Sequence, residues 1–127
     1  MNTVDWFDLH ELKIQGALYE LQEYVHSIAK SKGWYDQERT FPELIALMHS
    51  ELSEALEAYR KDPDVTHIYR GNYPDASKPE GVASELADVI IRILDAAESM
   101  SIPLVREMFE KLKYNETRPY RHGGKSV

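Results

Sequence analysis

The sequence contains no cysteine and no long apolar run, and it has fewer basic than acidic residues. The absence of cysteine excludes disulfides, thiolate metal sites and cysteine nucleophiles. The 22 acidic residues outnumber 15 Lys and Arg, and the formal net charge of −7 argues against a general affinity for nucleic acid or anionic membranes. No window approaches the ~18 apolar residues of a membrane span, and the first residues lack the basic and apolar regions of a signal peptide. We therefore expect a cytoplasmic protein that binds neither nucleic acid nor membrane.

Strand patterns and phosphate-binding glycine loops are also missing. No stretch alternates between polar and apolar residues with hairpin turns, and no P-loop is present. With 127 residues, 43% of them hydrophobic, the chain suits a single domain over residues 1–127. Four helical segments can be recognised, so we predict an all-α protein of the four-helix-bundle type.

Local signals mark the ends of these helices. Apolar residues at helical spacing predict a first helix over about Leu9–Lys30, which Gly33 would end as a C-cap. Capping boxes with a proline in the first turn predict helix starts at Thr40–Glu43 and Ser77–Glu80. Ser101–Pro103 offers a cap and a proline for a fourth helix.

The second predicted helix carries a carboxylate on its apolar side. At ~100° per residue, Glu51 falls among Leu and Ala positions, and Glu54 lies at the edge of the same stripe. An ionised carboxylate in an apolar core is costly, so it is normally neutralised, paired or bound to a cation.

The third predicted helix repeats this acidic spacing. It is apolar around most of its circumference, and Glu85 and Asp88 lie one turn apart on its narrow polar strip. If the two helices pack together, four carboxylates converge and favour a hard divalent cation, Mg²⁺ first and Mn²⁺ second. The alternative is an ion pair between Asp88 and Arg92 on a solvated strip, with Glu51 reaching solvent.

The two motifs, Glu51-Leu-Ser-Glu54 and Glu85-Leu-Ala-Asp88, resemble the ExxE…ExxD signature of MazG-like all-α nucleoside triphosphate pyrophosphohydrolases. The C-terminal "KLKYNETRPYRHGGK" is similar to a Lys-, Asn- and Arg-containing segment of that family. The resemblance implies hydrolysis of a (deoxy)nucleoside triphosphate to the monophosphate and pyrophosphate, with Mg²⁺ held by Glu51, Glu54, Glu85 and Asp88. Residues 55–84 separate the motifs, slightly more than in the family, and the long connection Asp62–Ser77 accounts for the excess.

The C-terminal segment 111–127 is basic in an otherwise acidic chain. Its charged residues are Lys111, Lys113, Arg118, Arg121 and Lys125 against Glu116. Cations near a carboxylate cluster suit a triphosphate, and we expect Lys111, Asn115 and Arg118 to bind phosphate. The alternative is a solvated tail.

Two further roles concern the base and the water. Trp34 lies in the connection before the acidic helix and could stack on a nucleobase, or it could cover the end of the bundle. Glu51 or Glu54 is the candidate general base. Because the third helix is so apolar, we expect a homodimer or homotetramer. The alternative functions are phosphoribosyl-ATP pyrophosphohydrolase and a non-catalytic helical module that binds a partner.

Overall fold

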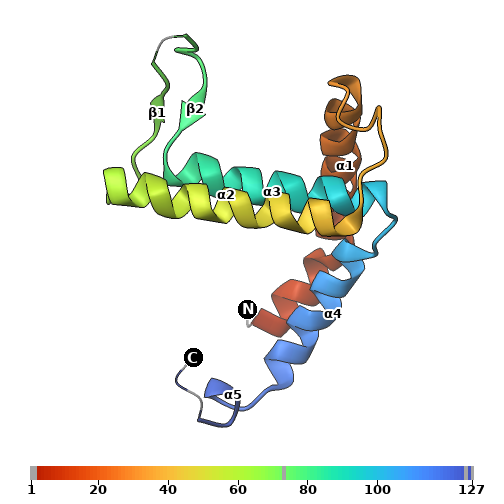
Figure 1. The fold of residues 1–127 in the computed structure, drawn as a ribbon. Coiled ribbons are helices and arrows are strands. Elements are labelled where there is room, and N and C mark those ends of the chain that lie inside the picture. The colour runs from red at the N-terminus through yellow and green to blue at the C-terminus, as the bar shows by residue number, and fades with distance from the viewer. Residues whose placement is uncertain (1–2, 73, 125, 127) are drawn as a thin grey trace.

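The computed structural model describes residues 3–72, 74–124 and 126, and it is mostly helical, as the sequence predicts. The helices are α1 (Thr3–Ser31), α2 (Phe41–Lys61), α3 (Val82–Ser99), α4 (Leu104–Thr117) and the short α5 (Arg121–Gly124). Figure 1 shows α2 and α3 lying side by side and antiparallel. Helix α1 crosses them near the end at which α2 begins, and α4 runs back along the first part of α1. The described part of the chain contains no helix that is long and apolar enough to cross a membrane.

The turn after α1 ends the helix as predicted. Gly33 has a positive φ of 83° and donates to the carbonyl of Lys30 at 3.0 Å, while Trp34 donates to the carbonyl of Ala29 at 3.2 Å. These two bonds form a Schellman motif, which favours glycine because its backbone adopts the left-handed conformation without strain. The helix itself starts earlier than the expected Leu9.

The start of α2 is also as predicted. The Thr40 hydroxyl accepts a hydrogen bond from the Glu43 amide at 3.3 Å, and the Glu43 carboxylate accepts one from the Thr40 amide at 3.1 Å. This capping box satisfies two amides that have no partner within the helix. It places the first residue of α2 at Phe41.

The predicted capping box at Ser77–Glu80 is wrong. Pro79–Glu80 forms a short strand, β2, which pairs antiparallel with β1 (Tyr69–Arg70), so the expectation of a chain without strands is also wrong at this point. The amide and hydroxyl of Ser77 donate to the carboxylate of Asp75, within the turn of the hairpin. A local hydrogen bond of this kind competes with helix capping, and here the turn prevails.

Glycine sets the true start of α3. Gly81 precedes the helix with a φ of 109°, and a Cβ atom there would lie 3.0 Å from the carbonyl oxygen of His67 and 3.1 Å from the ring of Tyr69. The long connection that the sequence indicated is therefore a hairpin that packs closely against Gly81, the residue before α3. From there it projects away from the helix pair (Figure 1).

Ser101 ends α3 and does not cap α4, contrary to the prediction from Ser101–Pro103. Its φ is 53°, and it donates to the carbonyl of Glu98 at 3.4 Å, while Ile102 donates to that of Ala97 at 2.9 Å. This is a second Schellman motif, with serine where glycine is usual. Helix α4 starts after Pro103 without a side-chain cap.

The buried core is small and lies where α1, α3 and α4 meet, with contributions from α2. Among the described residues, the buried apolar side chains are Val25, Leu44, Ala55, Leu94, Ala96, Ala97, Val105 and Phe109. In contrast, the middle of α3 exposes Leu86, Ile90 and Ile91 at 46%, 58% and 46%. The helix that is most apolar in sequence is therefore only partly covered by its own chain.

We predict that Ser101→Gly stabilises the protein by about 0.5–1 kcal/mol, because the left-handed conformation costs a residue with a Cβ roughly 1–2 kcal/mol more than it costs glycine. The matched control is Ser50→Gly, an exposed position inside α2, which should lower stability by about 0.5 kcal/mol. Urea unfolding followed by circular dichroism measures both. A destabilised Ser101→Gly protein would contradict this account of the α3 terminus.

Candidate metal centre and adjoining pocket

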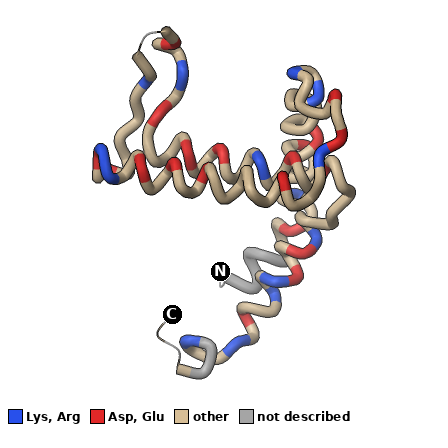
Figure 2. The backbone as a smooth tube through the Cα atoms, viewed as in Figure 1, with Lys and Arg blue, Asp and Glu red and all other residues tan. Residues whose placement is uncertain are grey.

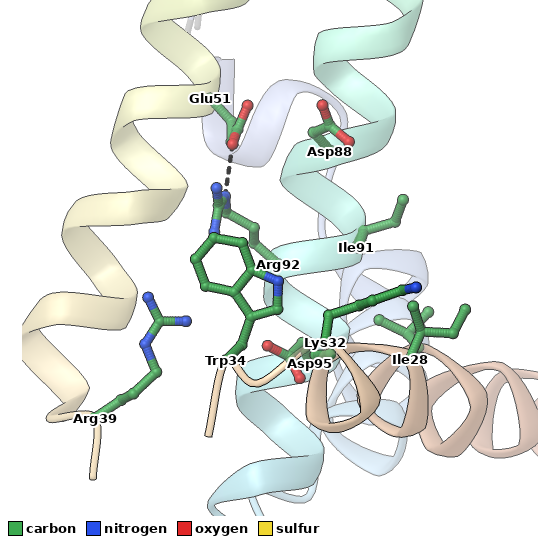
Figure 3. Close-up of a pocket in the computed structure, with 11 residues that line it drawn as sticks. Ile28, Lys32, Trp34, Arg39, Glu51, Asp88, Ile91, Arg92 and Asp95 are labelled. Carbon is green, nitrogen blue, oxygen red and sulfur yellow. Dashed lines mark hydrogen bonds and ion pairs between the residues drawn. The ribbon is translucent and has the colours of Figure 1, made fainter. Parts of the chain in front are cut away.

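The pairing of α2 with α3 brings three carboxyl groups together. Oxygen atoms of Glu51, Glu54 and Glu85 lie within 4.8 Å of one another. Glu51 is buried and 6% exposed, whereas Glu54 is exposed and Glu85 is half-buried. The i, i+3 spacing on α2 and the antiparallel packing on α3 together produce this cluster, which we call the acidic triad. Asp88, the fourth predicted ligand, is not in the triad but faces Glu51 across the neighbouring pocket (Figure 3).

Burial and the crowding of like charges together raise the pKa of most of these groups. Burial and the nearby Glu54 raise the pKa of Glu85 from 4.5 to about 7. The hydrogen bond and charge of Glu51 raise the pKa of Glu54, while burial and the charge of Glu51 raise that of Asp88. The site therefore favours either bound protons or another source of positive charge.

Glu51 is the exception, because it has a cationic partner. Arg92 of α3 donates from Nε to Glu51 Oε1 at 2.6 Å. Burial alone would raise the pKa of Glu51, but the hydrogen bond and charge of Arg92 contribute to a net lowering. The carboxylate on the apolar side of α2 is thus paired. The alternative expected from the sequence placed Arg92 with Asp88, one turn away on the same helix, but its hydrogen bond crosses to α2.

A pocket of about 240 Å³ adjoins the triad and is formed between α1, α2, α3 and the connection after α1. It is lined by Val25, Ile28, Ala29, Lys32, Trp34, Arg39, Glu51, Asp88, Ile91, Arg92 and Asp95. Its wall thus combines the indole of Trp34, three cations and three carboxylates, one of which is Glu51 of the triad itself (Figure 3). Trp34 is 55% exposed, and the Arg39 guanidinium lies 5.3 Å from the centre of its ring.

The connection that carries Trp34 is tied to α3 by Asp95. The Tyr35 hydroxyl donates to Asp95 Oδ2 at 2.6 Å, and His26 Nδ1 lies 2.7 Å from Asp95 Oδ1. Burial, followed by the hydrogen bond to Asp95, raises the pKa of Tyr35. Tyr35 is half-buried, and its hydrogen bond to Asp95 fixes one wall of the pocket. Asp95 was not among the site residues predicted from the sequence, although its position on the polar strip of α3 was a usable signal.

The predicted phosphate-binding residues are not brought to the triad within one chain. Lys111 and Asn115 lie on α4, and Arg118 follows its end. Helix α4 packs against α1, where Lys113 forms an ion pair with Glu11 at 2.8 Å. Figure 2 shows the basic positions of this segment on the arm that leads away from the acidic α2–α3 pair. Lys125, also part of the predicted basic segment, lies outside the described residues.

Comparison with known proteins adds no relative. No family model, curated protein or solved structure matches the chain. The resemblance to MazG-like enzymes therefore depends on the two acidic motifs and the C-terminal segment alone.

We predict that stability in EDTA at low ionic strength falls as the pH rises from about 5 to about 8. The pKa of Glu85 is higher in the folded chain, about 7, than its ordinary 4.5. The contribution of Glu85 to the free energy of unfolding is therefore fully present below pH 4.5 and is lost as the pH rises through 7. Glu54 and Asp88, also with raised pKa values, act in the same direction.

Urea melts of wild type and Glu85→Gln across this pH range provide the measurement. The glutamine variant should show a shallower decline, because it has lost the group with the largest pKa shift. Glu57→Gln, an exposed change on α2, should keep the wild-type slope. A wild-type stability that rises throughout the range would contradict the charge crowding at the triad.

Proposed function

We propose that the protein is a Mg²⁺-dependent pyrophosphohydrolase that cleaves a (deoxy)nucleoside triphosphate to the monophosphate and pyrophosphate. The observation that carries the proposal is the convergence of Glu51, Glu54 and Glu85 from two helices beside a pocket that contains an indole. Their arrangement in the motifs ExxE and ExxD, which resemble those of MazG-like enzymes, favours this reaction over other uses of an acidic site.

The donor set suits a hard divalent cation. All three groups offer carboxylate oxygen, the ligand type that Mg²⁺ and Mn²⁺ prefer. The pKa values of Glu54 and Glu85 are raised, and that of Glu51 is lowered with the help of Arg92. Full ionisation of all three groups therefore needs a compensating positive charge. In this proposal Glu51, Glu54 and Glu85 would hold the cation, and Asp88 would be a further ligand. Bound there, the cation would neutralise phosphate oxygens and increase the acidity of a water molecule.

The protein's own groups would orient the substrate and move the proton. Glu54 is the candidate general base because it is exposed, so it could accept a proton from water at the mouth of the site. Trp34 would stack on the base, held in place by the tie between Tyr35 and Asp95. The pocket walls would exclude bulk water from the reacting phosphate.

The surface area supports an oligomer as the active form. The chain exposes 9723 Å². A compact monomer of 14.7 kDa would expose only about 6,900 Å², so the excess is roughly 2,800 Å². If each of two copies buried that excess, the interface would cover roughly 5,600 Å² in total, which is at the upper end for obligate interfaces. The four helices would then complete a bundle with those of a second copy.

The apolar residues that such an interface would use follow a shared pattern. Leu52 and Leu56 follow Glu51 by one and five positions, and Leu86 and Ile90 follow Glu85 by the same offsets. All four are 46–58% exposed. Because α2 and α3 are antiparallel, equal offsets place these side chains on one common flank of the pair. We call this the apolar flank. A second copy would also be needed for any role of Lys111, Asn115 and Arg118 at the triad.

We predict that Glu54→Gln and Asp88→Asn each lower turnover by at least ~100-fold, because a lost or displaced ligand misplaces both metal and water. Glu57→Gln on the same helix is the control and should keep wild-type activity. Pyrophosphate release from a panel of common and oxidised nucleotides, including phosphoribosyl-ATP, measures the effect and identifies the substrate. Near-wild-type turnover in either variant would remove that residue from the site.

We predict that Ile90→Asp on the apolar flank dissociates the oligomer, because it buries a charge without a partner in the interface. Ile68→Asp is the control, since Ile68 is 77% exposed but lies outside the helix pair. Sedimentation velocity of wild type and both variants gives the result. A monomeric wild type, or an Ile90→Asp protein of unchanged mass, would contradict the proposed interface.

A further inference from the structure

We propose that Arg92 is an exchangeable counter-ion, which pairs with Glu51 when no metal is bound and transfers to an anionic phosphate group of the ligand when a divalent cation takes its place. The inference depends on the proposed metal site and adds a specific role for an arginine outside the two acidic motifs. It assigns to one residue both the stability of the metal-free protein and part of the binding of the phosphate chain.

Arg92 and a bound cation would compete for one carboxylate. Glu51 belongs to the acidic triad, yet one of its oxygens already accepts the hydrogen bond from Arg92 at 2.6 Å. A cation bound by the triad would draw on the same buried group and would repel the guanidinium at close range. Metal binding should therefore weaken or break this ion pair.

A released Arg92 would have another place to bind. Its side chain is 31% exposed and lines the pocket together with Lys32 and Arg39. Figure 3 shows its guanidinium between Glu51 and the indole of Trp34, next to the open space. A planar guanidinium with several donors suits two phosphate oxygens at once, so a ligand phosphate in this pocket could replace the carboxylate as its partner.

The metal-free chain needs the ion pair between Arg92 and Glu51. Glu51 is 6% exposed, and a buried carboxylate without a partner is strongly destabilising. Arg92 thus meets a requirement that disappears once a cation is bound. Two opposite consequences follow for a neutral residue at position 92: the cation should bind more tightly, and the phosphate ligand should bind more weakly.

The direct test follows the Arg92 side chain in the wild-type protein. In ¹⁵N-labelled protein without metal, the Arg92 Nε–H signal should show the shift of a carboxylate-bonded group, with the assignment made by its loss in Arg92→Lys. Titration with Mg²⁺ should move or broaden that signal over the concentrations at which Mg²⁺ raises the melting temperature. Addition of pyrophosphate should then produce a third position. Arg60, which forms an exposed ion pair with Glu57 at 3.4 Å on α2, is the internal control and should not shift.

Binding measurements test the opposite effects. We expect Arg92→Gln to bind Mn²⁺ at least ~3-fold more tightly and Mg²⁺-pyrophosphate at least ~3-fold more weakly than wild type, given the usual strength of a charge-assisted hydrogen bond. Arg60→Gln should change neither value. If Arg92→Gln does not fold without metal, Arg92→Lys keeps the charge but not the planar fork and should still lose affinity for pyrophosphate.

The outcomes separate this inference from the proposed function. An unmoved Arg92 signal at a Mg²⁺ concentration that saturates the shift in melting temperature would show a permanent structural ion pair and overturn the exchange alone. Equal Mn²⁺ affinity in wild type and Arg92→Gln would do the same. If neither the signal nor the melting temperature responds to Mg²⁺ or Mn²⁺, the metal site and the exchange are both wrong.

Discussion

The packing of α2 against α3 holds three carboxyl groups at a distance where like charges repel. Glu51, Glu54 and Glu85 lie within 4.8 Å of one another, and the pKa of Glu85 rises to about 7 as a result of burial and this crowding. The apolar contacts of the helix pair must offset the repulsion, and Arg92 relieves part of it by pairing with Glu51. An arrangement that opposes stability in this way is typical of functional sites, where strain is retained for ligand binding.

The remaining elements position the walls around this centre. The Schellman motif at Gly33 and the capping box at Thr40 fix the two ends of the connection that carries Trp34, and the bond from Tyr35 to Asp95 ties its middle to α3. At the other end of the pair, Gly81 lets the hairpin pack against the start of α3. Local backbone signals at both ends of α2 and α3 therefore determine how the carboxylates and the pocket face each other.

Much of this could be read from the sequence, because it depends on local periodicity. The helices, the turn at Gly33 and the pairs Glu51/Glu54 and Glu85/Asp88 follow from spacing and capping rules. The Arg92 to Glu51 bond could not, because a competing partner, Asp88, lies one turn away on the same helix and only the packing of α2 on α3 decides between them. Ser101 was misread as a cap since its left-handed conformation depends on the path of the chain into α4. The strands at Tyr69 and Pro79 are too short to show alternation.

Direct binding of Mn²⁺ is the simplest test of whether the triad holds a divalent cation. Electron paramagnetic resonance measures the concentration of free Mn²⁺ in the presence of protein. At about pH 8, the carboxyl groups with raised pKa values are largely ionised. We predict saturable binding by wild type and an affinity at least ~10-fold weaker in Glu54→Gln/Glu85→Gln. Glu57→Gln should bind as wild type does. A wild-type titration that matches buffer alone, or an unchanged affinity in the double variant, would contradict the account.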